Sequence, residues 1–291
     1  RTPLAALFAA GALTLAACGG GESSSAPEPS VAEDAEFDAG TTMAELNESG
    51  AIRIGTKFDQ PGFGLENLEG ELEGFDVEVG KIIAGALGIE EDGIEWVETP
   101  SAVREEVLEG DEVDMVVATY TINDERKERI TFAGPYYVAG QQIMVAADNE
   151  DITGPESFTD NPDATVCSVT GSTPSENIRE YLASEDQLVL FEEYSQCADA
   201  LGNGQVDAVT TDNVILLGFV AESDGEFKLV GEQFTEEPYG IGITKGDVEF
   251  CEFINTTLQE NEDAYLEAWE ATAGQVEGTE APELPEPDEC A

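Results

Sequence analysis

The sequence predicts an α/β protein whose chain folds into two lobes joined by two crossover strands. Short apolar runs alternate with segments of helical periodicity, a pattern typical of α/β units with mostly parallel strands. The stretch 43–275 is longer than one small core usually holds, so it suits one large domain or two lobes. Two strand-like segments, 141–146 and 240–244, enclose its middle part. If they lie side by side as crossovers, lobe 1 comprises residues 43–142 plus 239–275, and lobe 2 comprises residues 143–238.

The first element along the chain is an apolar run of fourteen residues, 4–17, which ends at Cys18. Such a run is too short to span a bilayer and is typical of a signal peptide. The residues Leu15-Ala16-Ala17-Cys18 resemble a bacterial lipobox, after which the signal is cleaved and the cysteine acylated. The alternative is an ordinary secretory signal with an incidental cysteine. We expect a signal peptide over residues 1–17 and a protein anchored through Cys18, by lipid alone, to the outer face of the cell membrane.

Two segments that flank the lobes have compositions unsuited to a core. Residues 18–42 are mainly Gly, Ser, Pro, Ala and acids, which cannot bury enough apolar surface to offset the entropy of ordering, so they predict a flexible tether. Residues 276–291 alternate Pro with Glu and predict an extended, exposed, acidic tail, which Cys290 could pin.

Within the lobes, apolar and β-branched runs predict strands and longer amphipathic segments predict helices. The strands are expected at 52–56, 94–97, 113–118, 165–169, 188–191, 206–210 and 227–230. The helices between and after them are expected at 75–87, 103–108, 175–181, 195–201, 214–220, 249–258 and 264–272.

The charge of the chain is strongly negative. Lys and Arg total 11 against 64 Asp and Glu, with no His, for a net charge of -53. This charge argues against nucleic acid or an anionic membrane surface as a partner, leaving the N-terminal lipid as the only membrane contact. The acids are spread along the whole chain, which favours a folded protein adapted to high salt. Metal storage is the alternative, but it is disfavoured by the absence of His and of a clustered carboxylate loop, so we expect no metal site.

Four cysteines follow Cys18, and an even number in an exported protein favours disulfides. Of the three possible pairings we expect Cys167 with Cys197 and Cys251 with Cys290, because each pair closes one local loop. A metal site is the competing interpretation, but no CxxC spacing supports it.

The most informative stretch is 113–137, in which a buried strand runs into the loop Thr119-Tyr120-Thr121 and then into a short helix. Asn123 suits the N-cap of that helix, and Arg126 follows in its first turn. Taken alone, Arg126 could merely form a surface ion pair within its charged run, an interaction of little energetic value.

This strand–loop–helix stretch resembles family 3 of the bacterial extracellular solute-binding proteins, which bind polar amino acids. The resemblance extends over about residues 51–274. It implies a periplasmic-binding-protein-like fold of type II, with two α/β lobes and a two-strand hinge. By position it assigns the backbone of Thr119, the hydroxyl and amide of Thr121, and Arg126 to the ligand's main-chain groups. A guanidinium suits the α-carboxylate because its fork matches the two oxygens.

Two further motifs lie in the expected lobe 2. The turn Gly171-Ser172-Thr173 follows a strand and precedes a helix that begins near Pro174, and the resemblance assigns it to the same carboxylate. Asp212 ends another strand-into-loop motif, and the resemblance implies that it pairs with the ligand's ammonium. Each motif has a structural alternative: Ser and Thr at a helix start are usually simple caps, and Asp212 could instead only cap the helix that follows it.

Side-chain selectivity is expected from residues 54–64. Lys57 is one of few cations in the chain and could pair with a side-chain carboxylate, where family members for neutral or cationic amino acids tend to carry an acid. The amino-acid sequence of these motifs resembles that of the glutamate-binding branch of the family, which is found in actinobacteria. Arg104 is a candidate second cation near the ligand, and Phe63 a candidate cover for its methylenes, although a loop aromatic is as often plain packing.

The function implied by the resemblance is capture without chemistry. The two lobes would close on glutamate, and the monomeric receptor would deliver it to an ABC permease whose separate ATPase subunits hydrolyse ATP. No cofactor is expected, because the chain has neither GxxxxGK[ST] nor a GxGxxG after a strand. Aspartate and glutamine are alternative ligands, and an amino-acid sensor is an alternative role. An enzyme on the same scaffold would need a perturbed Asp or Glu as its base, since His is absent.

Overall fold

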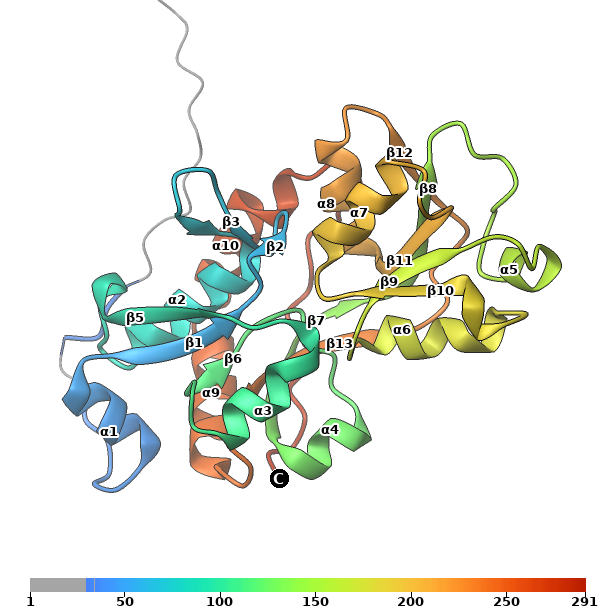
Figure 1. The fold of residues 1–291 in the computed structure, drawn as a ribbon. Coiled ribbons are helices and arrows are strands. Elements are labelled where there is room, and N and C mark those ends of the chain that lie inside the picture. Colours follow the sequence, from blue (N-terminus) through green and yellow to red (C-terminus); the bar gives the residue numbers. More distant parts are fainter. Residues whose placement is uncertain (1–29, 34) are drawn as a thin grey trace, which may run out of the picture.

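A computed structural model describes residues 30–33 and 35–291 as two α/β lobes (Figure 1). The expected signal peptide, Cys18 and the first part of the expected tether lie outside the described residues. Within the described part of the chain, no helix is both long and apolar enough to cross a bilayer.

Lobe 1 is built on a five-stranded sheet of order β5-β1-β6-β13-β7. Strand β1 (Ile52–Thr56) pairs in parallel with β5 (Ile94–Glu98) and β6 (Met115–Val116). Strand β13 (Glu237–Ile243) runs antiparallel between β6 and β7 (Thr131–Ala139). A small second sheet carries β2 (Asp59–Gln60), β3 (Gly64–Glu66) and β4 (Leu72–Glu73).

Helices cover both faces of the lobe 1 sheet, so its strands are buried on both sides. Met115 belongs to one apolar core and its neighbour Val116 to another, because successive strand residues point to opposite faces. The first core is completed by α1 (Thr42–Ser49), α2 (Phe75–Ala86), α9 (Val248–Glu260) and α10 (Glu262–Ala271). The second is completed by α3 (Arg104–Glu109), and α4 (Asp124–Arg129) follows the 119–121 loop.

Lobe 2 repeats the design with a sheet of order β10-β9-β11-β8-β12. Strand β9 (Val166–Val169) pairs in parallel with β10 (Leu188–Phe191) and β11 (Ala208–Asp212). Strand β8 (Gln141–Ala146) is antiparallel to β11 and to β12 (Phe227–Val230). The helices of this lobe are α5 (Ser157–Asp160), α6 (Thr173–Asn177), α7 (Tyr194–Gly202) and α8 (Asn213–Glu222).

The chain passes between the lobes twice, but not through the pair of strands expected from the sequence. Segments 141–146 and 240–244 do not lie side by side: β8 belongs to the lobe 2 sheet, whereas β13 pairs with β7. The crossings are at Gly140, between β7 and β8, and in the segment between β12 and β13. The sequence did not predict β7 because Gly134 and Pro135 interrupt its apolar pattern, and such residues usually weaken a strand.

Part of the expected tether packs on lobe 1. The Phe37 and Phe253 rings meet edge to face with centroids 5.5 Å apart, and the Ala32 amide donates to the Gly85 carbonyl at 2.9 Å. Phe37 is the only aromatic residue in the stretch 18–42, and its burial gives this segment the apolar anchor that its composition otherwise lacks. Over residues 35–41 the structure therefore differs from a flexible tether.

Two disulfides join the pairs that the sequence predicts. Cys167 in β9 is bonded to Cys197 in α7, and Cys251 in α9 is bonded to Cys290 in the tail. The tail has no helix or strand beyond Gln275, but it is held to lobe 1 at several points besides the disulfide. The Asp288 amide donates to the Gly134 carbonyl at 2.7 Å, for example, and Leu284 packs against the first core of lobe 1.

Candidate functional site

The two lobes meet around a small cavity of about 10 Å³ at the carboxyl ends of their parallel strands. Ligands of α/β sheets commonly bind at this edge, because loops from several strands converge there. Lobe 1 contributes Ser101, Arg104, Thr119 and Thr121 to the cavity wall, and lobe 2 contributes Ser172, Thr173, Pro174, Tyr194, Thr211, Asp212 and Ile215.

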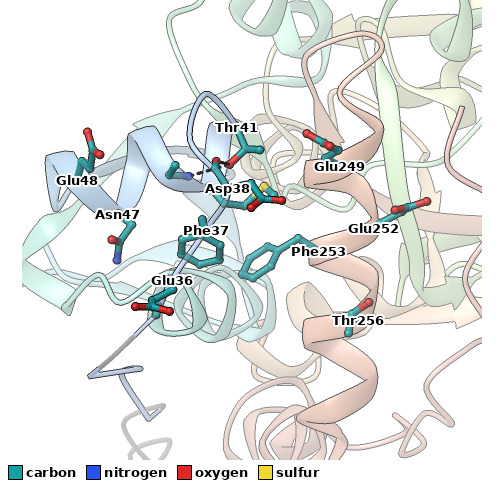
Figure 2. A pocket seen from close by; sticks show the side chains of 13 residues that line it. Glu36, Phe37, Asp38, Thr41, Asn47, Glu48, Glu249, Glu252, Phe253 and Thr256 are labelled. Atoms are coloured by element: carbon teal, nitrogen blue, oxygen red, sulfur yellow. Dashed lines mark hydrogen bonds between the residues drawn. The ribbon is translucent and has the colours of Figure 1, made fainter.

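A larger, open groove lies elsewhere, between α1 and α9 (Figure 2). Phe37 and Phe253 meet in it, and its ionisable side chains, all acidic, are Glu36, Asp38, Glu48, Glu249 and Glu252. A groove with acids and no cation has nothing to pair with a carboxylate. The smaller cavity between the lobes, which is lined by the buried cation Arg104 and the buried acid Asp212, is therefore the candidate site for an amino acid.

The lobes are in contact around this cavity. Asp59 of lobe 1 accepts hydrogen bonds from the backbone amides of Tyr194 and Ser195, at the start of α7, at 2.8 and 3.2 Å. Gly171 of lobe 2 approaches Ala102 so closely that an added Cβ would lie 2.7 Å from the Ala102 Cα. Glycine at position 171 thus permits this degree of closure, and it also suits the local φ of 76°.

Arg104 is one of two buried guanidinium groups at the site, and it lines the cavity. Its Nη1 donates to the Ala118 carbonyl at 3.0 Å and lies 3.3 Å from the Thr119 carbonyl, and the group stacks 4.1 Å above the Tyr120 ring. Burial, and then the charge of Arg126, lower the pKa of Arg104 from 12.5 to about 10, so it remains charged at neutral pH.

Arg126 lies just behind the cavity wall and bridges the lobes. Its Nη1 donates to the Thr121 carbonyl at 2.6 Å, and its Nη2 donates across the cleft to the Gly171 carbonyl at 2.9 Å. Its Nε pairs with Glu105 at 3.1 Å. A guanidinium has five N–H donors, so two of those of Arg126 have no partner among the described residues. The structural alternative of an exposed surface ion pair does not hold, because Arg126 is only 6% exposed.

The lobe 2 turn lies directly opposite. Ser172 caps α6, its Oγ accepting from the Ser175 amide at 3.1 Å, and it also lines the cavity. The Thr173 hydroxyl donates to Glu237 at 2.7 Å and lies 3.2 Å from the Thr121 hydroxyl in lobe 1. Ser172 therefore is an N-cap, as the structural alternative proposed, and it also forms part of the cavity wall.

Asp212 is 3% exposed and lines the cavity from the end of β11. Its Oδ2 accepts from the Tyr239 hydroxyl at 2.6 Å, while its Oδ1 has no hydrogen-bond partner in the described part of the protein. Burial, and then the nearby Glu237 charge, raise the pKa of Asp212 to about 8. Its side chain forms no capping bond to α8, so the helix-cap alternative is wrong for the side chain.

Lys57 is buried beside the site without lining the cavity. Its Nζ donates to Ser101 Oγ at 2.8 Å, and Ser101 forms the wall. Burial, and then the charge of Arg104, lower the pKa of Lys57 to about 7. The structure thus connects Lys57 to the cavity through Ser101.

Phe63 does not line the cavity, which corrects its assignment as a candidate cover for the ligand's methylenes. It is 1% exposed in the lobe 1 core, where its ring lies edge-on to Phe75 and Trp269 with centroids 6.0 and 6.3 Å away. Phe63 is therefore a packing residue of the lobe 1 core.

Sequence reasoning missed five residues of the wall: Ser101, Pro174, Tyr194, Thr211 and Ile215. Thr211 and Pro174 could have been found, since each adjoins an expected site residue in the same motif. Ser101 precedes Arg104 by less than one helical turn. Tyr194 and Ile215 carry no signal that separates them from ordinary core residues.

Comparisons with known proteins agree with this architecture. The family model of bacterial extracellular solute-binding proteins, family 3, matches residues 52–267. The chain is 41% identical over 233 residues to the glutamate-binding protein GluB of Corynebacterium efficiens, covering 77% of this chain and 78% of that protein. It is 36% identical over 254 residues to the glutamine-binding protein of Geobacillus stearothermophilus, covering 87% of this chain and 95% of that protein.

Among solved structures, an ancestral arginine-binding protein bound to glutamine matches with a TM-score of 0.71 at 33% identity. The match covers 79% of this chain and 99% of that one. The expected fold class, two α/β lobes of the type II periplasmic-binding-protein arrangement, is confirmed.

Proposed function

Because the chain belongs to family 3 of the bacterial extracellular solute-binding proteins, we propose that it captures glutamate by closing its two lobes. The observation that carries the proposal is a buried carboxylate oxygen, Asp212 Oδ1, which has no partner among the described residues. It lies at the same small cavity as the buried Arg104, with Arg126 directly behind.

The unpartnered groups match the main-chain groups of an amino acid. An ammonium placed against Asp212 Oδ1 would satisfy that oxygen and would restore the ionised form that burial disfavours. The two N–H donors of Arg126 without described partners could hold the α-carboxylate, aided by Thr121 and the 171–173 turn. A zwitterion thus requires one cation and one anion from the site.

The remaining charge supports an acidic side chain. After Arg126 and Asp212 are assigned to the zwitterion, Arg104 and Lys57 remain as buried cations, and Arg104 lines the cavity. The buried carboxylates nearest Lys57, Asp59 and Asp76, already accept hydrogen bonds from other groups, so a second carboxylate on the ligand would be favourable beside these cations. A relative at 41% identity is named as a glutamate-binding protein, which supports the same ligand.

Glutamine is the second candidate, and one feature favours it. Lys57 already donates to Ser101, and its pKa is lowered to about 7, so part of its population is neutral near pH 7. A neutral lysine suits an uncharged side-chain amide. The glutamine-binding relative from Geobacillus stearothermophilus supports this alternative. Aspartate remains a third candidate, since it shares the charge of glutamate.

The mechanism involves no covalent step. Ligand contacts made by both lobes would favour the closed conformation over an open one, and the two crossings at Gly140 and before β13 would serve as the hinge. We further propose that the closed receptor acts as a monomer held by its N-terminal lipid at the outer membrane face. It would deliver the amino acid to an ABC permease, whose ATPase subunits are separate chains. The family consists of solute-binding proteins, which supports this role over an enzyme or a sensor.

The test is isothermal titration calorimetry of the purified protein with glutamate, glutamine and aspartate, repeated with Arg126→Ala. We expect glutamate to bind more tightly than the other two ligands, and every amino acid to lose measurable binding in the variant. Tighter binding of glutamine would establish the second candidate. Near-native affinity in Arg126→Ala would refute the site.

A further inference from the structure

The loop that forms the lobe 1 wall of the cavity contains a strained backbone. Thr119 has a φ of 44°, in the left-handed region. A β-branched residue is unfavourable there, because its Cβ crowds the backbone carbonyl. Only two other non-glycine residues of the described chain have positive φ, Asp111 and Asp224, and aspartate tolerates this region far better than threonine. Among the described residues, Thr119 is thus the one β-branched residue with positive φ, and it lines the cavity.

A fully buried carboxylate holds this backbone from behind. The Thr119 amide donates to Asp76 Oδ2 at 2.7 Å, and the Tyr136 hydroxyl donates to Asp76 Oδ1 at 2.6 Å. Asp76 lies in the first turn of α2 and Tyr136 lies in β7, so two elements of the lobe 1 core fix the carboxylate. Neither residue lines the cavity.

The other polar groups of Thr119 are also held. Its hydroxyl lies within 3.0 Å of Gln60 Oε1, and its carbonyl lies 3.3 Å from Arg104 Nη1. The amide contact with Asp76 is shorter than these two contacts and is the one that has a buried carboxylate as acceptor, so it is the strongest restraint on the backbone.

We propose that Asp76 and Tyr136 are positioning residues that hold Thr119 in its left-handed conformation and so preform the lobe 1 wall of the amino-acid site. The inference rests on the proposed function, because it assumes that the ligand contacts this wall. Without the restraint, Thr119 would relax to a commoner backbone conformation, and the ligand would have to restore the strained one on binding.

The first experiment needs no ligand. Amide hydrogen exchange at Thr119, followed by NMR, should be slow in the unmodified protein and at least about tenfold faster in Asp76→Ala, because the amide loses its acceptor. The matched control is Glu78→Ala, which removes another buried carboxylate of α2 whose partner is Lys81 at 3.1 Å. Equal protection of Thr119 in Asp76→Ala and in the control would overturn the proposal.

The second experiment is a double-mutant cycle on glutamate affinity with Asp76→Ala and Thr119→Gly. With threonine at 119, Asp76→Ala should weaken glutamate binding about fivefold to thirtyfold. This factor corresponds to the cost of about 1–2 kcal/mol for holding a non-glycine residue in the left-handed region. With glycine at 119 the same change should cost less than about threefold, because glycine adopts the left-handed region without strain. An equal loss in both backgrounds would overturn the proposal and assign Asp76 to balancing the charges of Lys57 and Arg104.

Tyr136→Phe provides a milder variant in case Asp76→Ala does not fold, as judged by its melting curve. It removes one hydrogen-bond donor to Asp76, so it should weaken glutamate binding less than Asp76→Ala does. This loss of affinity should become smaller still when residue 119 is glycine. An equal loss with threonine and with glycine at 119 would count against the proposal. If the unmodified protein binds no amino acid, the proposed function fails, and the exchange experiment alone decides whether the restraint exists.

Discussion

At the residue scale, the site is defined by buried groups whose bonding is incomplete. One carboxylate oxygen of Asp212 accepts a hydrogen bond from Tyr239, and the other has no partner among the described residues. Likewise, two of the five N–H donors of Arg126 have no partner among the described residues. An unsatisfied buried polar atom costs stability, so such atoms are rare in native cores and often mark sites of function. Asp212 lines the cavity from lobe 2, and Arg126 lies just behind its lobe 1 wall, where it donates to the Thr121 carbonyl.

The raised pKa of Asp212 predicts a pH-dependent stability. Below its ordinary pKa of 3.8 the carboxyl is protonated both in the unfolded chain and in the closed protein, so its burial costs little. As the pH rises towards about 8, the unfolded chain loses this proton while the ligand-free closed protein retains it, so the folded state loses stability. Asp212→Asn removes this penalty. Its gain in melting temperature should therefore be near zero at about pH 4 and increase up to about pH 8.

Differential scanning calorimetry of the ligand-free protein across this pH range checks the prediction. Asp199→Asn is the matched control, since Asp199 is exposed on α7 and its replacement should change the melting temperature little at any pH. A gain for Asp212→Asn that does not vary with pH would contradict the account.

Lys57 tests the selectivity for a side-chain charge. Lys57→Met keeps the buried bulk and removes the ammonium, so a ligand carboxylate nearby would lose its counter-charge. Glutamate affinity should fall at least about tenfold while glutamine affinity changes by less than about threefold. Calorimetric titration with both ligands measures the difference. Ser101→Ala, which removes the described partner of Lys57, separates a direct role of the ammonium from one relayed through Ser101.

At the scale of elements, the sequence predicted several strands of the two sheets far better than the hinge. Strands β1, β10 and β12 have the expected bounds because each is a short apolar run between polar segments. Strand β7 was missed because Gly134 and Pro135 interrupt it; its pairing with β13 depends on segments about one hundred residues apart. Helix α1 was missed because its composition matches that of the preceding polar stretch.

The site was predictable where a motif places several residues on one loop. Thr119, Thr121, Ser172, Thr173 and Asp212 all reach the cavity from strand-to-helix turns, as their motifs indicated. Phe63 was misplaced because a loop aromatic near a site has the same pattern as one in a core. The strain at Thr119 and its restraint by Asp76 could not be predicted, because they depend on a contact across forty-three residues.

The Cys251–Cys290 disulfide ties the tail to α9 and should stabilise the folded chain without affecting the ligand site. Replacing both cysteines by Ala should lower the free energy of unfolding by about 4 kcal/mol in the chain-entropy model, because the closed loop spans 39 residues. Urea denaturation measures this loss, and calorimetry should find glutamate affinity within about twofold of the unmodified protein. A large loss of affinity would show instead that the tail supports the closed lobes.

At the scale of the whole molecule, the net charge of -53 surrounds a site with three buried cations, Lys57, Arg104 and Arg126. Surface carboxylates repel one another and destabilise the compact state when they are poorly screened. The buried cations are shielded from salt by the closed lobes, so surface and site should respond to salt differently.

This contrast predicts the effect of sodium chloride. The Debye length falls from roughly 30 Å at 0.01 M to roughly 3 Å at 1 M, so the melting temperature should rise steeply over this range. Glutamate affinity should persist at high salt because its contacts are enclosed. At about pH 4, where many carboxyls are protonated, the salt dependence of melting should be weaker. A melting temperature that does not respond to salt would contradict adaptation to high salt.

The most direct measurement is a crystal structure of the protein with glutamate. The account predicts one glutamate molecule between the lobes, with its ammonium about 2.7–2.9 Å from Asp212 Oδ1 and its α-carboxylate held by Arg126. The side-chain carboxylate should lie on the side of Arg104 and Lys57. Glutamate bound outside this cavity, for example in the groove between α1 and α9, or bound between the lobes with its ammonium away from Asp212, would contradict the account.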